Sequence, residues 1–104
     1  MKLTSKQRAY LKSLAAKETA LFQIGKENLS PEVTNAVSEA FNTREIVKVS
    51  VLKAATEDPK VMGEALAGRT GATLVQIIGR KIVLYKPFDK PEIILPKAAK
   101  NDSE

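Results

Sequence analysis

Apolar residues recur along this chain with two periods, and each period predicts one type of secondary structure. Between residues 31 and 42 they follow the i, i+3, i+4, i+7 spacing of a helix that turns one face to a core. That stripe consists of Val33, Ala36, Val37, Ala40 and Phe41. From Ile46 to Leu52, valines instead alternate with Lys48 and Ser50. This spacing predicts a strand with one buried face and one wetter face.

A first helix is predicted from Thr4 to about residue 16. Thr4 and Gln7 have the spacing of a capping box, in which each side chain bonds the backbone of the other residue. The residues that repeat on the inner side are Tyr10, Leu11, Leu14 and Ala15, and those left mostly outside are Lys6, Arg8, Lys12 and Ser13.

The other two helices begin with an N-capping residue followed by proline, which has no N–H to leave unpaired in the first turn. Ser30 precedes Pro31 in this way, and Asp58 precedes Pro59. The third helix is predicted to run to about residue 69, with Gly71 as its C-terminal stop. Its inward-facing residues are expected to be Val61, Met62, Ala65 and Leu66.

Three further segments have the character of strands. Residues 20–24 form a short apolar run that ends at Gly25, and residues 73–78 and 81–86 are separated only by Gly79 and Arg80. Glycine at the first central position suits a type II′ turn, so the last two strands are predicted to form an antiparallel hairpin.

The predicted order is therefore α-β-α-β-α-β-β, an α/β fold with three helices packed on a four-stranded mixed sheet. Strands separated by helices are expected to be joined by right-handed crossovers. Residues 1–96 are interpreted as a single domain, in which Ile93 to Leu95 could dock as an extended edge. Residues 97–104 are expected to be a disordered tail.

Composition removes several classes of function. The chain has 104 residues and contains neither cysteine nor histidine. It therefore has no thiolate zinc site or disulfide, and it lacks the commonest general base and metal ligand. No apolar run approaches the roughly 20 residues that span a bilayer. The sequence predicts a cytoplasmic protein with no catalytic residue, no metal, no cofactor, no small-molecule substrate and no membrane association.

The charge distribution favours a polyanionic partner. The formal net charge is +5, and the chain up to Lys17 contains no acidic residue. A small basic domain with a locally cationic helix is typical of nucleic-acid binding, although many soluble proteins are mildly basic.

The segment from Gly25 to Pro31 has the outline of an anion site. A strand passes through a tight loop carrying Lys26 into the start of a helix, whose N-terminus has unpaired N–H groups and a partial positive charge. A plain strand-to-helix turn explains the same segment equally well.

The sequence also resembles a known family. Residues 40–49 and the run Val75-Gln76-Ile77-Ile78-Gly79-Arg80-Lys81-Ile82-Val83-Leu84-Tyr85 carry the likeness, which covers about residues 3–86. It is similar to the CRM domain of the YhbY-like family of small bacterial RNA-binding proteins. The resemblance implies a fold similar to the C-terminal domain of translation initiation factor three, a Gly-x-x-Gly loop beside a basic surface, and a link to ribosome assembly.

The loop itself departs from that pattern, because Asn28 stands where the family usually has its second glycine. Asparagine enters the left-handed backbone region at low cost, so the turn is expected to survive. The resemblance implies that Asn28→Gly would preserve or improve RNA binding, while Glu27 adds a negative charge to the loop.

The interpretation drawn from residues and resemblance together is a monomeric RNA-binding domain that engages structured ribosomal RNA during large-subunit assembly. Each cation alone is ordinarily a solvated surface charge. Aromatic stacking is limited to Tyr10, Tyr85 and Phe88, so phosphate contacts are expected to dominate over base contacts. The residues assigned to RNA contact are Gly25, Lys26, Glu27, Asn28, Lys6, Arg8, Lys12, Arg44, Lys48, Arg80, Lys81 and Lys86.

Two other classes of function compete with this interpretation. An enzyme would have to rely on neighbouring carboxylates such as Glu57 and Asp58, but Asp58 is explained as a helix cap and no base is present to activate a serine. A protein-interaction adaptor on ribosomal particles would use an apolar patch such as Ile93 to Leu95, and its binding would depend only weakly on salt.

Overall fold

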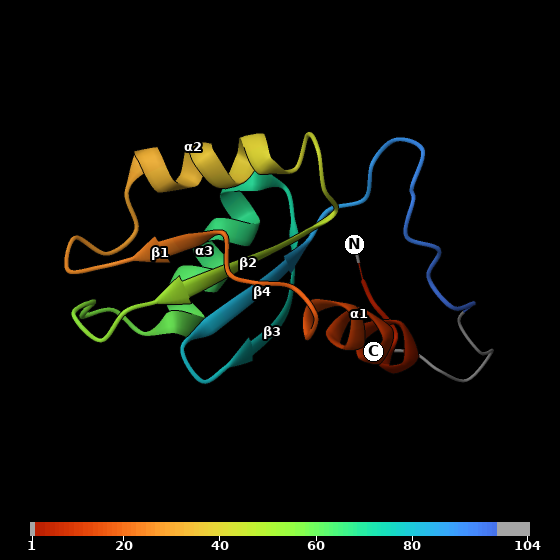
Figure 1. Ribbon diagram of the computed structural model, residues 1–104, viewed down its shortest axis with the longest axis horizontal. Helices are drawn as coiled ribbons and strands as arrows, with labels where there is room; N and C mark the ends of the chain where they lie inside the picture. Colours follow the sequence, from red (N-terminus) through yellow and green to blue (C-terminus); the bar gives the residue numbers. More distant parts are fainter. Residues whose placement is uncertain (1, 98–104) are drawn as a thin grey trace.

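The predicted order of elements is confirmed in a computed structural model that describes residues 2–97 (Figure 1). The elements are α1 (Ser5–Ala15), β1 (Phe22–Ile24), α2 (Pro31–Ala40), β2 (Ile46–Val51), α3 (Pro59–Thr70), β3 (Thr73–Ile78) and β4 (Lys81–Tyr85). All three predicted caps form, including the reciprocal hydrogen bonds between Thr4 and Gln7. Gly71 ends α3 with a φ of 76°. Beyond Lys97, the predicted tail lies outside the described residues.

The four strands form one mixed sheet in the order β1-β2-β4-β3. β1 and β2 are parallel, whereas β4 is antiparallel to both of its neighbours. β3 and β4 are joined by the predicted hairpin, in which Gly79 has a φ of 59° and Arg80 has no positive φ, as a type II′ turn requires. β4, the last strand in the sequence, thus occupies an interior position of the sheet.

One face of the sheet is covered by α2 and α3, which bury the larger hydrophobic cluster. The inward residues of α3 include Met62, Gly63 and Leu66. The prediction that Val61 also faces inward is wrong, because its side chain is 55% exposed. Gly63, rather than a larger residue, faces the sheet at this point of α3. Because it has no side chain, the backbone of α3 lies close to the sheet.

The opposite face is covered only in part, by α1 and by the segment 87–96, which we call the strap. Leu3, Leu11 and Ala15 pack there against side chains of β2, β3 and β4, and the strap contributes Ile93 and Leu95. Figure 1 shows α1 in red near the blue strap, far from the loop that follows β1. Tyr10, predicted to be inward-facing, is 39% exposed.

Glu45 fastens the strap, a role that no pattern in the sequence indicates. Its carboxylate is only 4% exposed, and it accepts hydrogen bonds from the backbone amides of Phe88 (2.9 Å), Glu92 (3.1 Å) and Ile93 (2.7 Å). The strap contains no strand. Docking of 93–95 as an extended edge is therefore wrong, because the amides of Glu92 and Ile93 bond to a side chain rather than to a neighbouring strand.

Tyr85 cannot serve as the stacking platform considered from the sequence, because it is only 1% exposed. Burial, together with the negative charge of Glu45, raises the pKa of its phenol. The ring therefore remains a neutral part of the core.

Candidate nucleic-acid interface

Three connecting segments meet at one end of the sheet. Because β1, β2 and β3 run in the same direction, the loop after β1, the loop after β2 and the β3–β4 turn all lie at the end where these strands finish. Figure 1 shows these loops at the left and lower left, opposite α1 and the strap. We call this region the loop end and define it by residues 25–28, 52–57 and 79–81.

Within the first loop, Gly25 and Asn28 close a tight turn. The carbonyl of Gly25 accepts a hydrogen bond from the amide of Asn28 at 2.9 Å, and Asn28 has a φ of 60°. The prediction that asparagine would preserve the left-handed conformation is confirmed. Lys26 and Glu27 occupy the tip and are both exposed, so the loop presents one charge of each sign.

The N-terminus of α2 offers fewer amides to an anion than the sequence suggested. The hydroxyl of Ser30 accepts from the amide of Val33 at 3.2 Å, the carbonyl of Ser30 accepts from the amide of Thr34, and Pro31 has no N–H. Electrostatic attraction at this loop must therefore come mainly from Lys26 rather than from the helix.

Two of the predicted contact residues brace α1. Arg8 donates from Nη1 to the carbonyls of Leu74 (3.0 Å) and Val75 (2.6 Å), at the bulge in the edge strand β3. Lys48 donates from Nζ to the carbonyls of Ala15 (3.1 Å) and Glu18 (3.3 Å), at the C-terminus of α1. A cation there also interacts favourably with the helix dipole. Both side chains are half-buried, so the prediction that Arg8 lies mostly outside is wrong.

Two more predicted contact residues secure other junctions. Arg80 donates from Nε to the carbonyl of Val51 at 2.9 Å and from Nη2 to that of Leu52 at 2.8 Å, which ties the hairpin turn to the end of β2. Lys86 donates from Nζ to the carbonyl of Thr70 at 2.9 Å and so caps the end of α3. Arg80 remains at the loop end, whereas Lys86 lies past the other end of the sheet.

Four polar residues and the exposed Ile78 lie on the part of the sheet that α1 leaves uncovered. Strand pairing places Gln23, Ser50, Lys81 and Ile78 in one row across all four strands, with Lys48 in the next row on the same face. We call these five residues the open sheet face. Lys12 of α1 and Lys48 line one hollow beside it, together with Ile78. The structure therefore brings Lys12, Lys48 and Lys81 to one side of the molecule and places Lys81 at the loop end.

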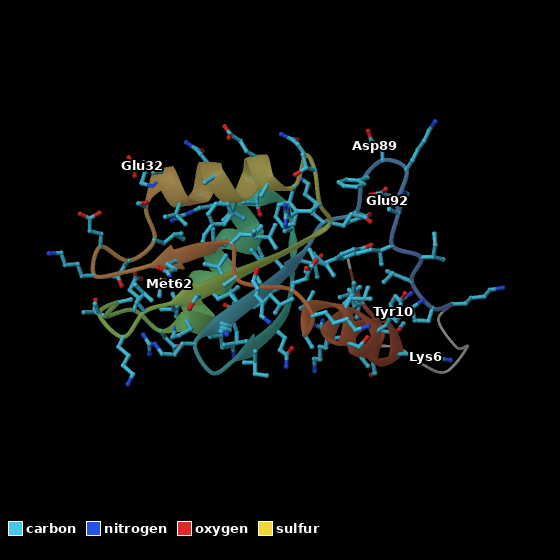
Figure 2. The ribbon with its side chains drawn as sticks, in the orientation of Figure 1. Lys6, Tyr10, Glu32, Met62, Asp89 and Glu92 are labelled. Atoms are coloured by element: carbon cyan, nitrogen blue, oxygen red, sulfur yellow. The ribbon has the colours of Figure 1, made fainter. Side chains whose placement is uncertain are left out.

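Two other candidate cations lie away from this region. Arg44 is exposed but precedes β2, at the opposite end of the sheet from the loops. Lys6 is exposed near the start of α1, and Figure 2 places it at the far end of the long axis from Glu32 in the first turn of α2. The molecule measures 44 Å along that axis. A single compact ligand at the loop end would therefore not reach Lys6.

The described residues do not contain the groupings that a metal centre or a membrane anchor needs. In residues 2–97 no group of three or more Asp or Glu side chains is placed to hold a metal ion. Nor does any helix in this stretch have the length and apolar character required to cross a membrane. The fold and the site together define a small α/β domain that presents a basic, loop-rich end.

Comparison with known proteins places this domain in a family. Residues 3–86 match the CRS1 / YhbY (CRM) domain, so the chain belongs to that family. It is 43% identical over 95 residues to "Probable RNA-binding protein YqeI" of Bacillus subtilis, covering 90% of this chain and 99% of the relative. It is 34% identical to an RNA-binding protein of Haemophilus influenzae, covering 91% of this chain and 96% of that one.

A solved structure confirms the fold. The solution structure of a hypothetical Staphylococcus aureus protein superimposes with a TM-score of 0.77 at 39% sequence identity, covering 90% of this chain and 99% of that one. The arrangement of three helices and a four-stranded mixed sheet is therefore shared with a relative whose structure is known.

Proposed function

We propose that this protein binds structured ribosomal RNA as a cytoplasmic monomer and assists assembly of the large ribosomal subunit, without catalysing a reaction. The convergence of three loops at one end of the sheet, with exposed Lys26 and Lys81, is the observation that supports RNA binding most strongly. Relatives that align over nearly their whole length are named as RNA-binding proteins, which supports the same partner.

The charges of the helices indicate how RNA would approach. α2 contains two glutamates and no cation, whereas Lys12 of α1 lies beside the open sheet face. A phosphate backbone should therefore lie against the loop end and the open sheet face rather than across α2. Recognition through phosphates would give modest sequence specificity.

The first test replaces the exposed lysine of the first loop. Lys26→Ala should weaken binding to ribosomal RNA fragments and lower the slope of log affinity against log salt by about 0.7–0.9, the value for one phosphate contact. Stability should change by less than about 0.5 kcal/mol, because the side chain is exposed.

Lys90→Ala is the matched control, because it removes the same charge from the exposed part of the strap. It should leave both affinity and slope close to those of the parent. Equal effects of the two substitutions would show that only total charge matters and would remove the loop end from the site. Sequencing RNA fragments crosslinked to the protein in cells would test whether the partner is ribosomal.

Arg80 and Lys81 are neighbours whose roles the structure separates. Arg80→Ala removes two hydrogen bonds to carbonyls, so it should lower the free energy of unfolding by about 1–3 kcal/mol as well as weaken RNA binding. Lys81→Ala should weaken binding with little change in stability, because this side chain is exposed. Urea unfolding and RNA titration of both variants check the distinction, and equal loss of stability would contradict it.

The adaptor alternative rests on one apolar surface. Ile94 is 75% exposed and lies beside Pro87, Pro91 and Leu95 of the strap. If this patch docks on a ribosomal protein, binding to particles should survive high salt and fail in Ile94→Asp. Loss of binding as salt rises, with Ile94→Asp bound normally, would favour RNA contact.

A further inference from the structure

Asn28 joins two loops that are distant in the sequence. Its Oδ1 accepts hydrogen bonds from the backbone amides of Thr56 at 2.9 Å and Glu57 at 3.0 Å. Its Nδ2 donates to the hydroxyl of Thr56 at 2.9 Å. Both ends of the carboxamide are thus engaged by the β2–α3 loop, while the backbone of Asn28 closes the first loop.

These contacts go beyond what the turn requires. A φ of 60° would be met equally well by glycine, which has no side chain to bond to Thr56 or Glu57. Asparagine at this position therefore satisfies the left-handed turn and also ties the loop 25–28 to the loop 52–57.

The second loop is held from its other side as well. The amide of Leu52 donates to the carbonyl of Ile24 at 2.8 Å, and the carbonyl of Leu52 accepts from Nη2 of Arg80 at 2.8 Å. Lys53 follows directly and is exposed. The backbone just before Lys53 is therefore tied both to the end of β1, next to the loop that carries Lys26, and to the hairpin turn, which carries Arg80.

We propose that Asn28 is a positioning residue that holds the two loops as one RNA-contacting unit, in which Lys53 contacts the same RNA as Lys26. The inference rests on the proposed RNA-binding function and adds Lys53 to the predicted site. It reverses the expectation that Asn28→Gly would preserve or improve binding. Holding the loops in place before RNA arrives lowers the entropic cost of ordering them on binding. Glycine at position 28 would bring that cost back, because it cannot bond to the second loop.

A double-mutant cycle in RNA affinity tests the coupling. Asn28→Gly and Lys53→Ala should each weaken binding about three- to tenfold, the range expected for losing pre-organisation or one phosphate contact. In the Asn28→Gly background, Lys53→Ala should weaken binding less than about twofold, because the second loop is then held at Leu52 but no longer at Thr56 and Glu57, so Lys53 is less well positioned. A purely structural role for Asn28 would leave the effect of Lys53→Ala the same in both backgrounds.

Two further variants and one local measurement sharpen the result. Thr56→Val removes only the hydroxyl that accepts from Nδ2, so its effect should lie between those of the parent and Asn28→Gly. Asn42→Gly, at an exposed position after α2, is the control and should bind as the parent does. The amide hydrogens of Thr56 and Glu57 should exchange faster in Asn28→Gly than in the parent. In Asn42→Gly they should exchange at the rate of the parent.

The outcomes also separate this inference from the function on which it rests. If the parent protein does not bind RNA, the proposed function is wrong. If the parent binds but Asn28→Gly binds equally well, or the effects of Asn28→Gly and Lys53→Ala multiply independently, the proposed function stands and the coupling between the loops is wrong.

Discussion

Glu45→Gln should lower the free energy of unfolding by about 2–3 kcal/mol, a large fraction of the stability of a small domain. The two carboxylate oxygens accept three backbone amides from the strap. A glutamine NH₂ must face at least one of these donors, and the remaining bonds lose the strengthening that a charged acceptor provides. Urea denaturation followed by circular dichroism measures the loss.

The matched control is Glu39→Gln, which makes the same chemical change at an exposed position of α2. It should alter stability by less than about 0.5 kcal/mol. Because the strap lies far from the loop end, the folded Glu45→Gln protein should keep the RNA affinity of the parent. A change in stability no larger than that of the control would show that the carboxylate does not fasten the strap.

The second large effect concerns the close approach of α3 to the sheet. A Cβ atom at Gly63 would lie 2.9 Å from Cδ1 of Ile77, 3.2 Å from Cδ1 of Leu74 and 3.3 Å from Cγ2 of Ile82. At Gly68, on the same helix, an added Cβ would meet nothing within 4 Å. Alanine raises helix propensity at both positions, so that gain cancels when the two variants are compared.

Gly63→Ala should therefore be less stable than Gly68→Ala by about 1–3 kcal/mol, the usual cost of overpacking a core. Gly68→Ala should itself be slightly more stable than the parent, by up to about 1 kcal/mol. Gly63→Val should enlarge the loss. Thermal unfolding of the three variants tests the order, and equal stability of the two alanine variants would show that the sheet side chains move aside without cost.

The helices and strands were predicted well because each signal, such as a helix cap or an alternation of apolar residues, lies within a few consecutive residues. The capping pairs placed all three helix starts, and the alternation of 46–52 placed β2 to within one residue at its end. The error at Val61 has a physical cause. A glycine gives no hydrophobic signal, so the periodicity could not show that Gly63 occupies the buried stripe.

The candidate site was harder to predict because its contacts join residues far apart in the sequence. Whether a lysine or arginine faces water or donates to a carbonyl depends on which element lies beside it. No local sequence pattern shows which carbonyls accept hydrogen bonds from Arg8 or Lys48. The hydrogen bond between Asn28 and Thr56 spans 28 positions. The left-handed backbone of Asn28 was predictable, since asparagine tolerates that region, but the hydrogen-bond partners of its side chain were not.

The position of β4 within the sheet sets the order in which this protein can complete its fold during synthesis. β1, β2 and α3 are all made before β4, yet β2 and β3 have no sheet contact with one another until β4 pairs with both. α1 can complete its packing only later still, because Ile93 and Leu95 of the strap belong to the hydrophobic cluster that it joins. Domains that rely on such distant contacts fold late and expose apolar surface meanwhile. A nascent chain stalled before the strap would therefore carry a largely formed α2–α3 face and an α1 that lacks the cover of Ile93 and Leu95.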